Sequence, residues 1–511
     1  MSESPSSVTT NPAAPSVWRG WAVVFVAACG LYAATASRGV QWQDPGEHIL
    51  RIVSGQLIHR LGLALSHPLH YWLGRLAARA PGVEPALAIT LVSAMAAAAA
   101  VANVYACVVL LTGRRAAAAW SAGSLAVAAT FWQWATLAET YAICAALLAA
   151  ECWLIVRYAQ TERGGLLLIL ALVNGLGVAN HLMALLTTPI LAALCLLALW
   201  RRHLWWAQLA AAVGLWVLGS LPYTGLILHE VLRSGQPVAT IRSALFGAHY
   251  AEAVFNTSVA LGPLAMTLAF VGYNFPNLLL PAAAVGIARG PALSVPRVAR
   301  RALLAALGVH LVFVLRYSVV DQHTFLVPSY VLLAIFGGLG YRAAAHWRAP
   351  RRRATLVLAW AMLGATPVVY AVAPMIARRV GLLDGVVRHK PYRDDYRYFM
   401  VPWSFAERSA ARMASEALGL AGPDGLIVAE DRMGTFALEY QRLRAGWDSL
   451  QIVRDPDADA IVGAARKGRP VVLVPTNVDR INTPAPVGRW CRIGDLYVLE
   501  AGTPTPTHHG P

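Results

Sequence analysis

The first three quarters of the chain alternate long apolar segments with short polar ones. A helix needs roughly 20 apolar residues to cross the hydrocarbon core of a membrane, and Trp21–Ala36, Ala86–Leu111 and Leu166–Val178 come close to that length or exceed it. The pattern predicts about eleven crossing helices, at residues 18–37, 86–111, 116–130, 140–158, 166–179, 183–200, 206–228, 257–289, 302–320, 325–341 and 355–373.

Two of these segments need interpretation. No convincing small-residue cleavage site follows the first one before Arg38, so we interpret it as a retained span and not as a signal peptide. The stretch at 257–289 forms either two short spans or one span preceded by a re-entrant helix broken near Asn274–Pro276. We prefer one crossing, because two would place the arginines at 297–301 on the outer side.

Composition supports a membrane protein. Hydrophobic residues make up 57% of the chain and charged residues 13%, with a mean hydropathy of +0.53. A soluble globular chain carries about 25% charged residues. This chain therefore has too little polar surface to cover its core in water.

The net charge of +16 comes almost wholly from arginines, which gather in short clusters between apolar segments. Such clusters flank membrane spans on the cytoplasmic side. The clusters at 114–115, 201–202, 297–301 and 348–353 predict a cytoplasmic N-terminus and an extracytoplasmic chain after Pro374. We interpret the charge as topology and expect no nucleic-acid partner.

The chain changes character near Arg378, where charged residues become common. Short β-type runs at Leu426–Ala429, Val471–Pro475 and Leu496–Leu499 and an amphipathic helix at Ala406–Leu418 predict a small α/β domain. The expected organisation is a disordered tail at 1–17, a spanning domain at 18–374 with an outer first loop at 39–85, a soluble extracytoplasmic domain at 375–502 and a flexible tail at 503–511.

Polar residues near the spans fall on one side of the membrane in this topology. Ionisable groups are costly there and often mark functional sites. The residues concerned come from four separate parts of the chain: Asp44, Glu47, His48, His67, His70, Glu139, Asn180, His181, Asp321 and His323. We therefore predict one shared site at the outer ends of the spans.

Each of these groups also has a purely structural interpretation. Asp44 is a possible N-cap with Pro45 at the first helical position and Glu47 as its capping-box partner, opening a helix from Glu47 to Leu65 that lies in the membrane interface. Asp44 and Glu47 would still face one pocket, because one helical turn separates them. The other groups suit a belt of aromatic residues, helix ends or turns equally well.

Metal and nucleotide signatures are weak. The sequence contains no HExxH motif, paired CxxC motif or phosphate-binding glycine loop. The acidic run Asp455-Pro456-Asp457-Ala458-Asp459 has the alternation to hold a hard cation, although a surface turn is the interpretation we favour. We expect no metal among the site residues and leave a divalent cation open.

Several motifs in this order resemble those of a family of bacterial multi-spanning proteins related to a eukaryotic membrane O-mannosyltransferase, within the GT-C glycosyltransferase superfamily. The resemblance covers most of the chain. Its motifs are Asp44-Pro45-Gly46-Glu47, His67-Pro68-Leu69-His70, Phe131-Trp132, Ala138-Glu139-Thr140-Tyr141, Gly175-Leu176-Gly177, Asn180-His181, Asp321-Gln322-His323-Thr324-Phe325, Pro328-Ser329-Tyr330 and the segment from Tyr392-Arg393-Asp394 to Pro402-Trp403.

The resemblance implies a GT-C-like helical membrane fold, a polyprenyl-phosphate sugar donor and an inverting reaction with an acidic base in the first outer loop. Asp44 is the first choice for this base and Glu47 the second. Arg51, Arg75 and His67 are candidates for the donor phosphate. The remaining candidates for substrate binding are His70, Glu139, Asn180, His181, Asp321 and His323.

The expected sugar is mannose and the expected acceptor a serine or threonine hydroxyl of a protein, with a lipid or a polysaccharide as the alternative acceptor. The expected location is the bacterial inner membrane. A transporter or flippase of lipid-linked saccharides is the main rival, but its binding groups usually lie near the middle of the bilayer. An inert assembly scaffold is a second rival.

Overall fold

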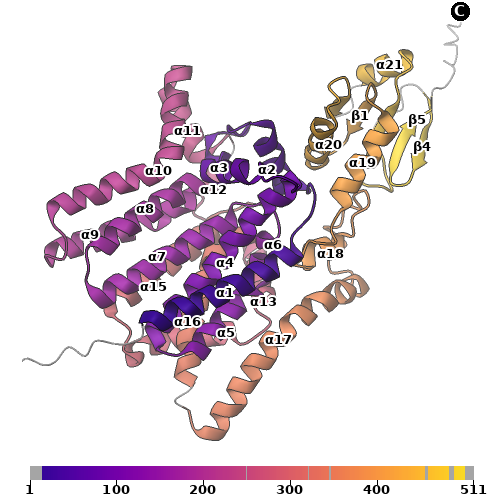
Figure 1. Ribbon diagram of the computed structural model, residues 1–511. Helices are drawn as coiled ribbons and strands as arrows, with labels where there is room; N and C mark the ends of the chain where they lie inside the picture. Colours follow the sequence, from indigo (N-terminus) through magenta and orange to yellow (C-terminus); the bar gives the residue numbers. More distant parts are fainter. Residues whose placement is uncertain are drawn as a thin grey trace, which may run out of the picture.

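The computed structural model describes residues 14–248, 250–319, 321–344, 347–454, 458–482 and 488–500. Most of the chain forms a bundle of long helices, and a small domain with a β-sheet stands at one end of it (Figure 1). The termini predicted to be disordered or flexible fall largely outside the described residues.

Eight helices of the described chain are long and apolar enough to cross a membrane. They are α1 (Ala14–Thr35), α4 (Pro85–Thr112), α7 (Tyr141–Thr161), the 3-10 turn η2 (Leu182–Leu186) with α9 (Thr188–Trp200), α10 (Trp206–Ser234), α15 (Arg297–Arg316), η4 (Gln322–Leu326) with α16 (Val327–Ala344), and α17 (Ala349–Arg379).

A bent pair of helices provides a ninth candidate span. Helix α13 (Leu261–Asn274) and helix α14 (Leu279–Arg289) meet at an angle of 99°. The break at Asn274 is the one that the sequence predicts. The pair also fits the preference for a single crossing in this stretch.

The expected eleven crossings are not confirmed. Helix α5 (Arg115–Ala126) has 12 residues and α8 (Gly165–Asn180) has 16, and both fall short of the roughly 20 that a full crossing requires. The apolar runs at 116–130 and 166–179 are real helices. Hydropathy alone overcounted, because short helices packed inside a bundle are as apolar as spans.

Shorter helices connect and cover the long ones. They are α2 (Gln43–Ser54), η1 (Leu63–Leu65), α3 (Pro68–Ala77), α6 (Ala129–Ala135), α11 (Pro237–Phe246), α12 (Ala251–Phe255), η3 (Gly290–Leu293) and α18 (Asp395–Met400).

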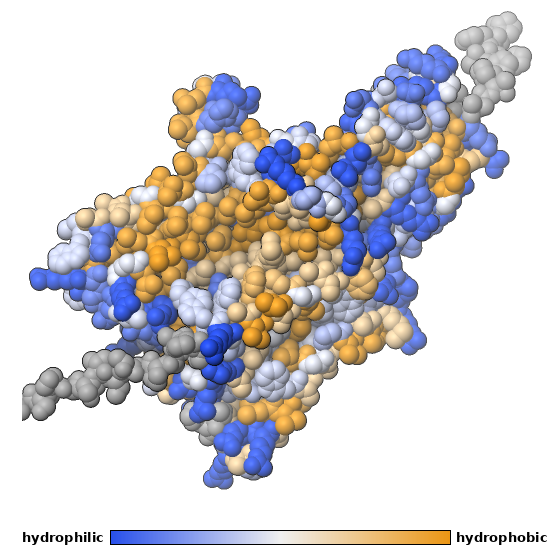
Figure 2. Space-filling view, in the orientation of Figure 1, coloured by the Kyte–Doolittle hydropathy of each residue, from blue (hydrophilic) through white to orange (hydrophobic). Residues whose placement is uncertain are grey.

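The arginine-rich ends of several helices meet at one end of the bundle. Gln160 at the end of α7 donates a hydrogen bond to the carbonyl of Leu110, and Arg342 at the end of α16 donates one to Leu111. Figure 2 shows a broad apolar surface over the bundle, with hydrophilic residues on the C-terminal domain and at helix ends. This distribution is that of an integral membrane protein.

Glycines let two helix pairs approach closely. A Cβ on Gly175 of α8 would lie 2.3 Å from the carbonyl oxygen of Trp216 in α10, and one on Gly340 of α16 would lie 1.8 Å from that of Ala282 in α14. Small residues serve this purpose in membrane helices, because lipid tails give little hydrophobic drive for association. These two contacts fix the positions of α8 and α16, and both helices lead to the site.

The C-terminal domain is a small α/β unit. Its elements are α19 (Ser409–Ala421), β1 (Leu426–Ala429), α20 (Arg432–Ala445), β2 (Gln451–Arg454), α21 (Ala458–Arg466), β3 (Val471–Val474), β4 (Trp490–Ile493) and β5 (Leu496–Leu499). The strand order is β2-β1-β3-β5-β4. Strands β2, β1 and β3 are parallel, and β5 pairs antiparallel with both β3 and β4. The three predicted strands are confirmed, whereas β2 and β4 escaped prediction because they carry few buried residues.

Helix α2 lies in the segment 39–85, which the sequence predicts to be the first outer loop, and it joins this domain to the bundle. Its buried residues Ile49 and Ile52 belong to one hydrophobic core with Met413 of α19 and Tyr440 of α20. The expected interfacial helix from Glu47 to Leu65 is therefore wrong: α2 ends at Ser54, where Gly55 adopts a left-handed conformation (φ 84°), and its apolar side packs against protein.

Candidate active site

Asp44 is an exposed carboxylate in the first turn of α2. Within the described chain, no hydrogen bond or ion pair of its side chain is found. The surrounding protein removes part of its hydration, and Asp321 and Glu47 add negative charge, so its pKa rises to about 6. The alternative interpretation as an N-cap is wrong, because Trp42 occupies that position.

Glu47 is buried and paired. Its carboxylate accepts from Arg60 Nε at 3.1 Å and lies 3.0 Å from Nε2 of His59. Burial raises the pKa of Glu47, but the hydrogen bonds and charges of His59 and Arg60 outweigh this and lower it overall. The two carboxylates of the first turns of α2 thus differ: Asp44 has no hydrogen-bond or ion-pair partner within the described chain, and Glu47 is paired.

A cluster of histidines lies beside these carboxylates. The ring of His48 makes edge contacts with His67 and His70 at centroid distances of 5.7 and 5.1 Å, and His67 stacks on His181 at 5.1 Å. Burial lowers the pKa of His48 and His67 well below the usual value and that of His70 to about 4. His48, His67 and His70 are therefore neutral at pH 7.

Residues from two further helix junctions join this cluster. His67 Nδ1 lies 2.7 Å from the carbonyl oxygen of Asn180, and His48 Nε2 lies 3.8 Å from Glu139. Burial, and then the charge of Asp44, raise the pKa of Glu139 well above its usual value. Two buried atoms, Nε2 of His70 and Oδ1 of Asn180, have no hydrogen-bond partner within the described chain.

The junction before α16 completes the acidic side of the site. Asp321 has an exposed side chain, but the surrounding protein removes part of its hydration and so raises its pKa. Its negative charge in turn raises the pKa of Asp44. His323 stacks on Phe270 of α13 at a centroid distance of 3.9 Å. Tyr250, whose pKa is raised by burial and then by Asp44 and Asp321, faces the same carboxylates.

The two arginines expected to bind the donor phosphate donate instead to backbone carbonyls. Arg51 is buried and donates to the carbonyls of Leu57, Leu65 and Ser66. Arg75 donates to the carbonyls of Ile52 and Val53 at 2.8 and 3.1 Å, at the end of α2. Both arginines hold the backbone of the first outer loop in place.

A search for metal-binding groups among the described residues finds no three His, Cys, Asp or Glu side chains arranged to hold an ion. The acidic run at 455–459 lies partly outside the described residues, since 455–457 are not among them.

The predicted site residues thus converge on one region, apart from the arginines that bind backbone carbonyls and His323, which stacks on Phe270. The sequence analysis missed His59, Arg60 and Tyr250. His59 and Arg60 are ordinary loop residues by pattern, and only the fold brings them to Glu47. Tyr250 carries an aromatic hydroxyl in a stretch assigned to no span, which was the one available signal.

Comparison with known proteins supports this picture. Residues 44–204, from Asp44 of the site to the turn between α9 and α10, match the family model of the N-terminal domain of the protein O-mannosyl-transferase TMEM260. A comparison with curated proteins gives no significant match.

The fold as a whole is similar to that of ArnT from Cupriavidus metallidurans. The apo structure has a TM-score of 0.59 at 16% identity and covers 95% of this chain and 98% of ArnT. The structure of ArnT bound to undecaprenyl phosphate has a TM-score of 0.59 at 15% identity, with the same coverage. The archaeal oligosaccharyltransferase AglB from Archaeoglobus fulgidus, with an inhibitory peptide and a dolichol-phosphate, has a TM-score of 0.47 at 10% identity and covers 91% of this chain and 70% of AglB. The expected GT-C-like fold and the resemblance to O-mannosyltransferase-like proteins are confirmed.

Proposed function

We propose that this protein is a membrane glycosyltransferase that moves a sugar from a polyprenyl-phosphate donor to a hydroxyl acceptor at the outer face of the membrane. The observation that carries the proposal is Asp44: an exposed, unpaired carboxylate with a pKa raised to about 6, where three helix junctions converge. A general base is most effective when its pKa lies near the working pH.

The reaction is an inverting substitution. Asp44 accepts the proton of the acceptor hydroxyl as its oxygen attacks the anomeric carbon of the sugar. The bond from that carbon to the phosphate oxygen breaks, and the polyprenyl phosphate leaves with the electron pair. Proton transfer by a positioned base contributes about 10²- to 10⁴-fold in rate.

The neutral polar groups beside Asp44 suit the sugar. The unpaired atoms of His70 and Asn180, with the ring of His67, offer hydrogen bonds to sugar hydroxyls without adding charge, and the carboxyl group of Glu139 offers a further one. His181 and Asp321 line the same region from the spanning side. We assign to Arg51 and Arg75 the positioning of the first outer loop, since their guanidinium groups bind its carbonyls.

The finer assignments follow from the similarities. The match to an O-mannosyl-transferase model supports mannose as the sugar and a serine or threonine hydroxyl as the acceptor. The undecaprenyl phosphate bound to ArnT supports a polyprenyl carrier. The arginine clusters support a cytoplasmic N-terminus, an extracytoplasmic domain at 375–502 and residence in a bacterial inner membrane.

A transfer assay tests the proposal. Membranes with wild type, Asp44→Asn, Glu47→Gln or the control Asp424→Asn receive radiolabelled polyprenyl-phosphate mannose and the acceptors of the host. Asp424 is exposed and lies in the C-terminal domain before β1. We expect Asp44→Asn to lose about 10²-fold or more of the signal, Glu47→Gln to lose less, and Asp424→Asn to match wild type.

Equal product from wild type and Asp44→Asn at matched expression would overturn Asp44 as base. Absence of product above empty membranes, across a panel of lipid-linked sugars, would overturn glycosyl transfer. In that case the transporter becomes the leading candidate.

A further inference from the structure

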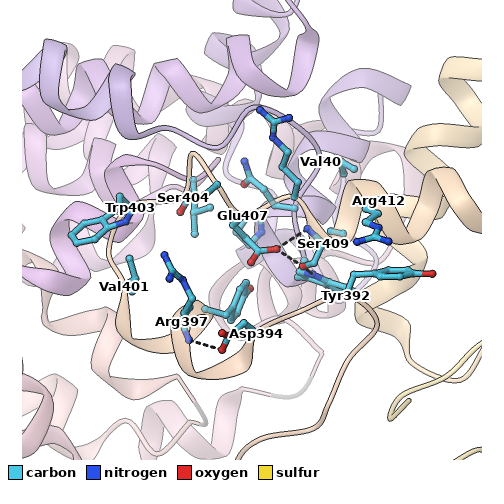
Figure 3. A pocket seen from close by; sticks show the side chains of 18 of the residues that line it. Val40, Tyr392, Asp394, Arg397, Val401, Trp403, Ser404, Glu407, Ser409 and Arg412 are labelled. Atoms are coloured by element: carbon cyan, nitrogen blue, oxygen red, sulfur yellow. Dashed lines mark hydrogen bonds between the residues drawn. The ribbon is translucent and has the colours of Figure 1, made fainter. Parts of the chain in front are cut away.

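A cavity lies next to the segment that carries Asp44, between the first loop and the residues that follow α17 (Figure 3). It measures 330 Å³, and its walls come from Val40–Trp42 and Pro45, from α6 and the turn after it, and from residues between 392 and 412. Tyr398 in its wall donates a hydrogen bond to the side chain of Gln43 at 3.3 Å, and Asp44 is one of the charges acting on Tyr398. Asp44 is not among the lining residues, but Trp42 and Pro45 on either side of it are, so the cavity is adjacent to the proposed base.

This cavity stands outside the membrane. None of the residues lining it lies in a candidate spanning helix of the described chain. The lining is mixed, with Trp403 at one end, Tyr392 at the other and polar side chains between them (Figure 3).

The uncompensated charge of the cavity is positive. Of its two carboxylates, Asp394 is paired with Arg378 at 2.6 Å. Glu407 accepts from the amide of Ser409 at 2.9 Å and keeps its negative charge, which is one against the two positive charges of Arg397 and Arg408. Arg412 pairs with Glu416 at 2.7 Å. The remaining arginines, Arg397 and Arg408, are exposed, and their guanidinium groups make no hydrogen bond or ion pair to any residue that the structure describes.

We propose that this cavity binds the acceptor as an extended polypeptide segment with acidic residues flanking its serine or threonine. Arg397 and Arg408 bind the flanking carboxylates, and the aromatic walls receive the backbone and the apolar side chains. The segment enters from the aqueous side and presents its hydroxyl to Asp44, whereas the lipid-linked donor approaches from the spanning side. This inference rests on the proposed function and names its acceptor.

The test measures binding without donor, so it is independent of transfer. The full-length Asp44→Asn protein in phosphatidylcholine nanodiscs is titrated against two fluorescein-labelled peptides. Each peptide has one threonine, flanked on both sides by two aspartates in the first peptide and by two lysines in the second. Fluorescence anisotropy reports the dissociation constant.

We expect the aspartate peptide to bind at least about 10-fold more tightly than the lysine peptide, and the double substitution Arg397→Glu with Arg408→Glu to remove that preference. Both side chains are exposed and unpaired, so the variant keeps its fold, and its thermal melting checks this. The matched control Arg466→Glu changes an exposed arginine of α21, outside the cavity lining, and should leave the affinity within about twofold of its parent.

Equal affinity for the two peptides, or an equal loss in Arg466→Glu, would overturn the inference. Displacement of the peptide by polyprenyl phosphate would also overturn it, because the cavity would then belong to the carrier. Selective peptide binding by a protein whose wild type transfers no sugar would leave this inference standing and overturn only the proposed function.

Discussion

At the scale of single residues, Asp44 and Glu47 lie one helical turn apart on α2 but have different surroundings. Glu47 is buried against His59 and Arg60, which hold its charge, whereas Asp44 is exposed and faces the negative charge of Asp321. Pairing lowers the pKa of Glu47, whereas loss of hydration and then the nearby negative charges raise the pKa of Asp44. Opposite shifts in neighbouring groups are typical of sites that assign distinct roles to similar side chains.

The raised pKa of Asp44 predicts the pH dependence of the rate. The base acts only when deprotonated, so kcat/KM should fall about tenfold per pH unit below pH 6 and level off above it. A pH profile of mannose transfer measures this. A profile flat from pH 5 to pH 7 would exclude a base with this pKa.

The same shift predicts the stability of Asp44→Asn. The folded protein binds the Asp44 proton more tightly than the unfolded chain, so stability is lost as pH rises from about 4 to about 6. Asp44→Asn removes this penalty and should raise the free energy of unfolding at pH 7.5, by about 1 kcal/mol or less because the group is exposed. Thermal melts at pH 7.5 and pH 4 compare the two, and the difference should vanish at the lower pH.

At the scale of elements, close helix contacts decide where the site residues stand. Helix α8 carries Asn180 at its end, and its Gly175 lies against the backbone of α10. Helix α16 is joined to Asp321 by the 3-10 turn η4, and its Gly340 lies against the backbone of α14. A one-ångström change in either contact would shift a group of the site.

Substitution of Gly340 by alanine tests this packing. The new Cβ would lie 1.8 Å from the carbonyl oxygen of Ala282, so α14 and α16 must separate. Overpacking of this kind costs about 1–3 kcal/mol. Gly364→Ala is the control, because a Cβ at Gly364 of α17 meets no described atom within 4 Å. Thermal melting in detergent should fall for Gly340→Ala alone, and equal melting of both variants would contradict the argument.

At the scale of the whole molecule, the C-terminal domain completes the surroundings of Asp44. Trp42, two residues before Asp44, donates a hydrogen bond of 2.7 Å to Ser409 of α19. Lys390 lies over the ring of Trp42 and forms a buried ion pair with Asp431 at the start of α20. The first outer loop is thus held between the bundle and the domain.

Breaking the ion pair should loosen this attachment. Lys390→Met leaves the carboxylate of Asp431 largely buried without its cation, which costs about 3 kcal/mol or more. The double variant Lys390→Met with Asp431→Asn removes the stranded charge and keeps a capping side chain on α20, so it should recover most of the loss. Limited proteolysis of the segment between α17 and α19 reports the attachment. Equal cleavage of both variants would show that the ion pair does not hold the domain.

The local pattern of apolar and polar residues was sufficient to predict many of the helices and strands of this protein. Apolar run length located the spanning helices, the break at Asn274 and the strands β1, β3 and β5, because these features depend on consecutive residues. The same pattern overcounted crossings at α5 and α8, since hydropathy does not distinguish a buried helix from a spanning one. The convergence of Asp44, Glu139 and His181 followed from topology alone.

Only the tertiary structure decided which of these groups is free to react. Glu47 differs from Asp44 through His59 and Arg60, and Arg51 is committed to carbonyls of the loop. The cavity with Arg397 and Arg408 exists because a segment some 350 residues away packs against Val40–Pro45. Side-chain pairing and burial are set by contacts between distant segments, and the pattern along a single chain does not record those contacts.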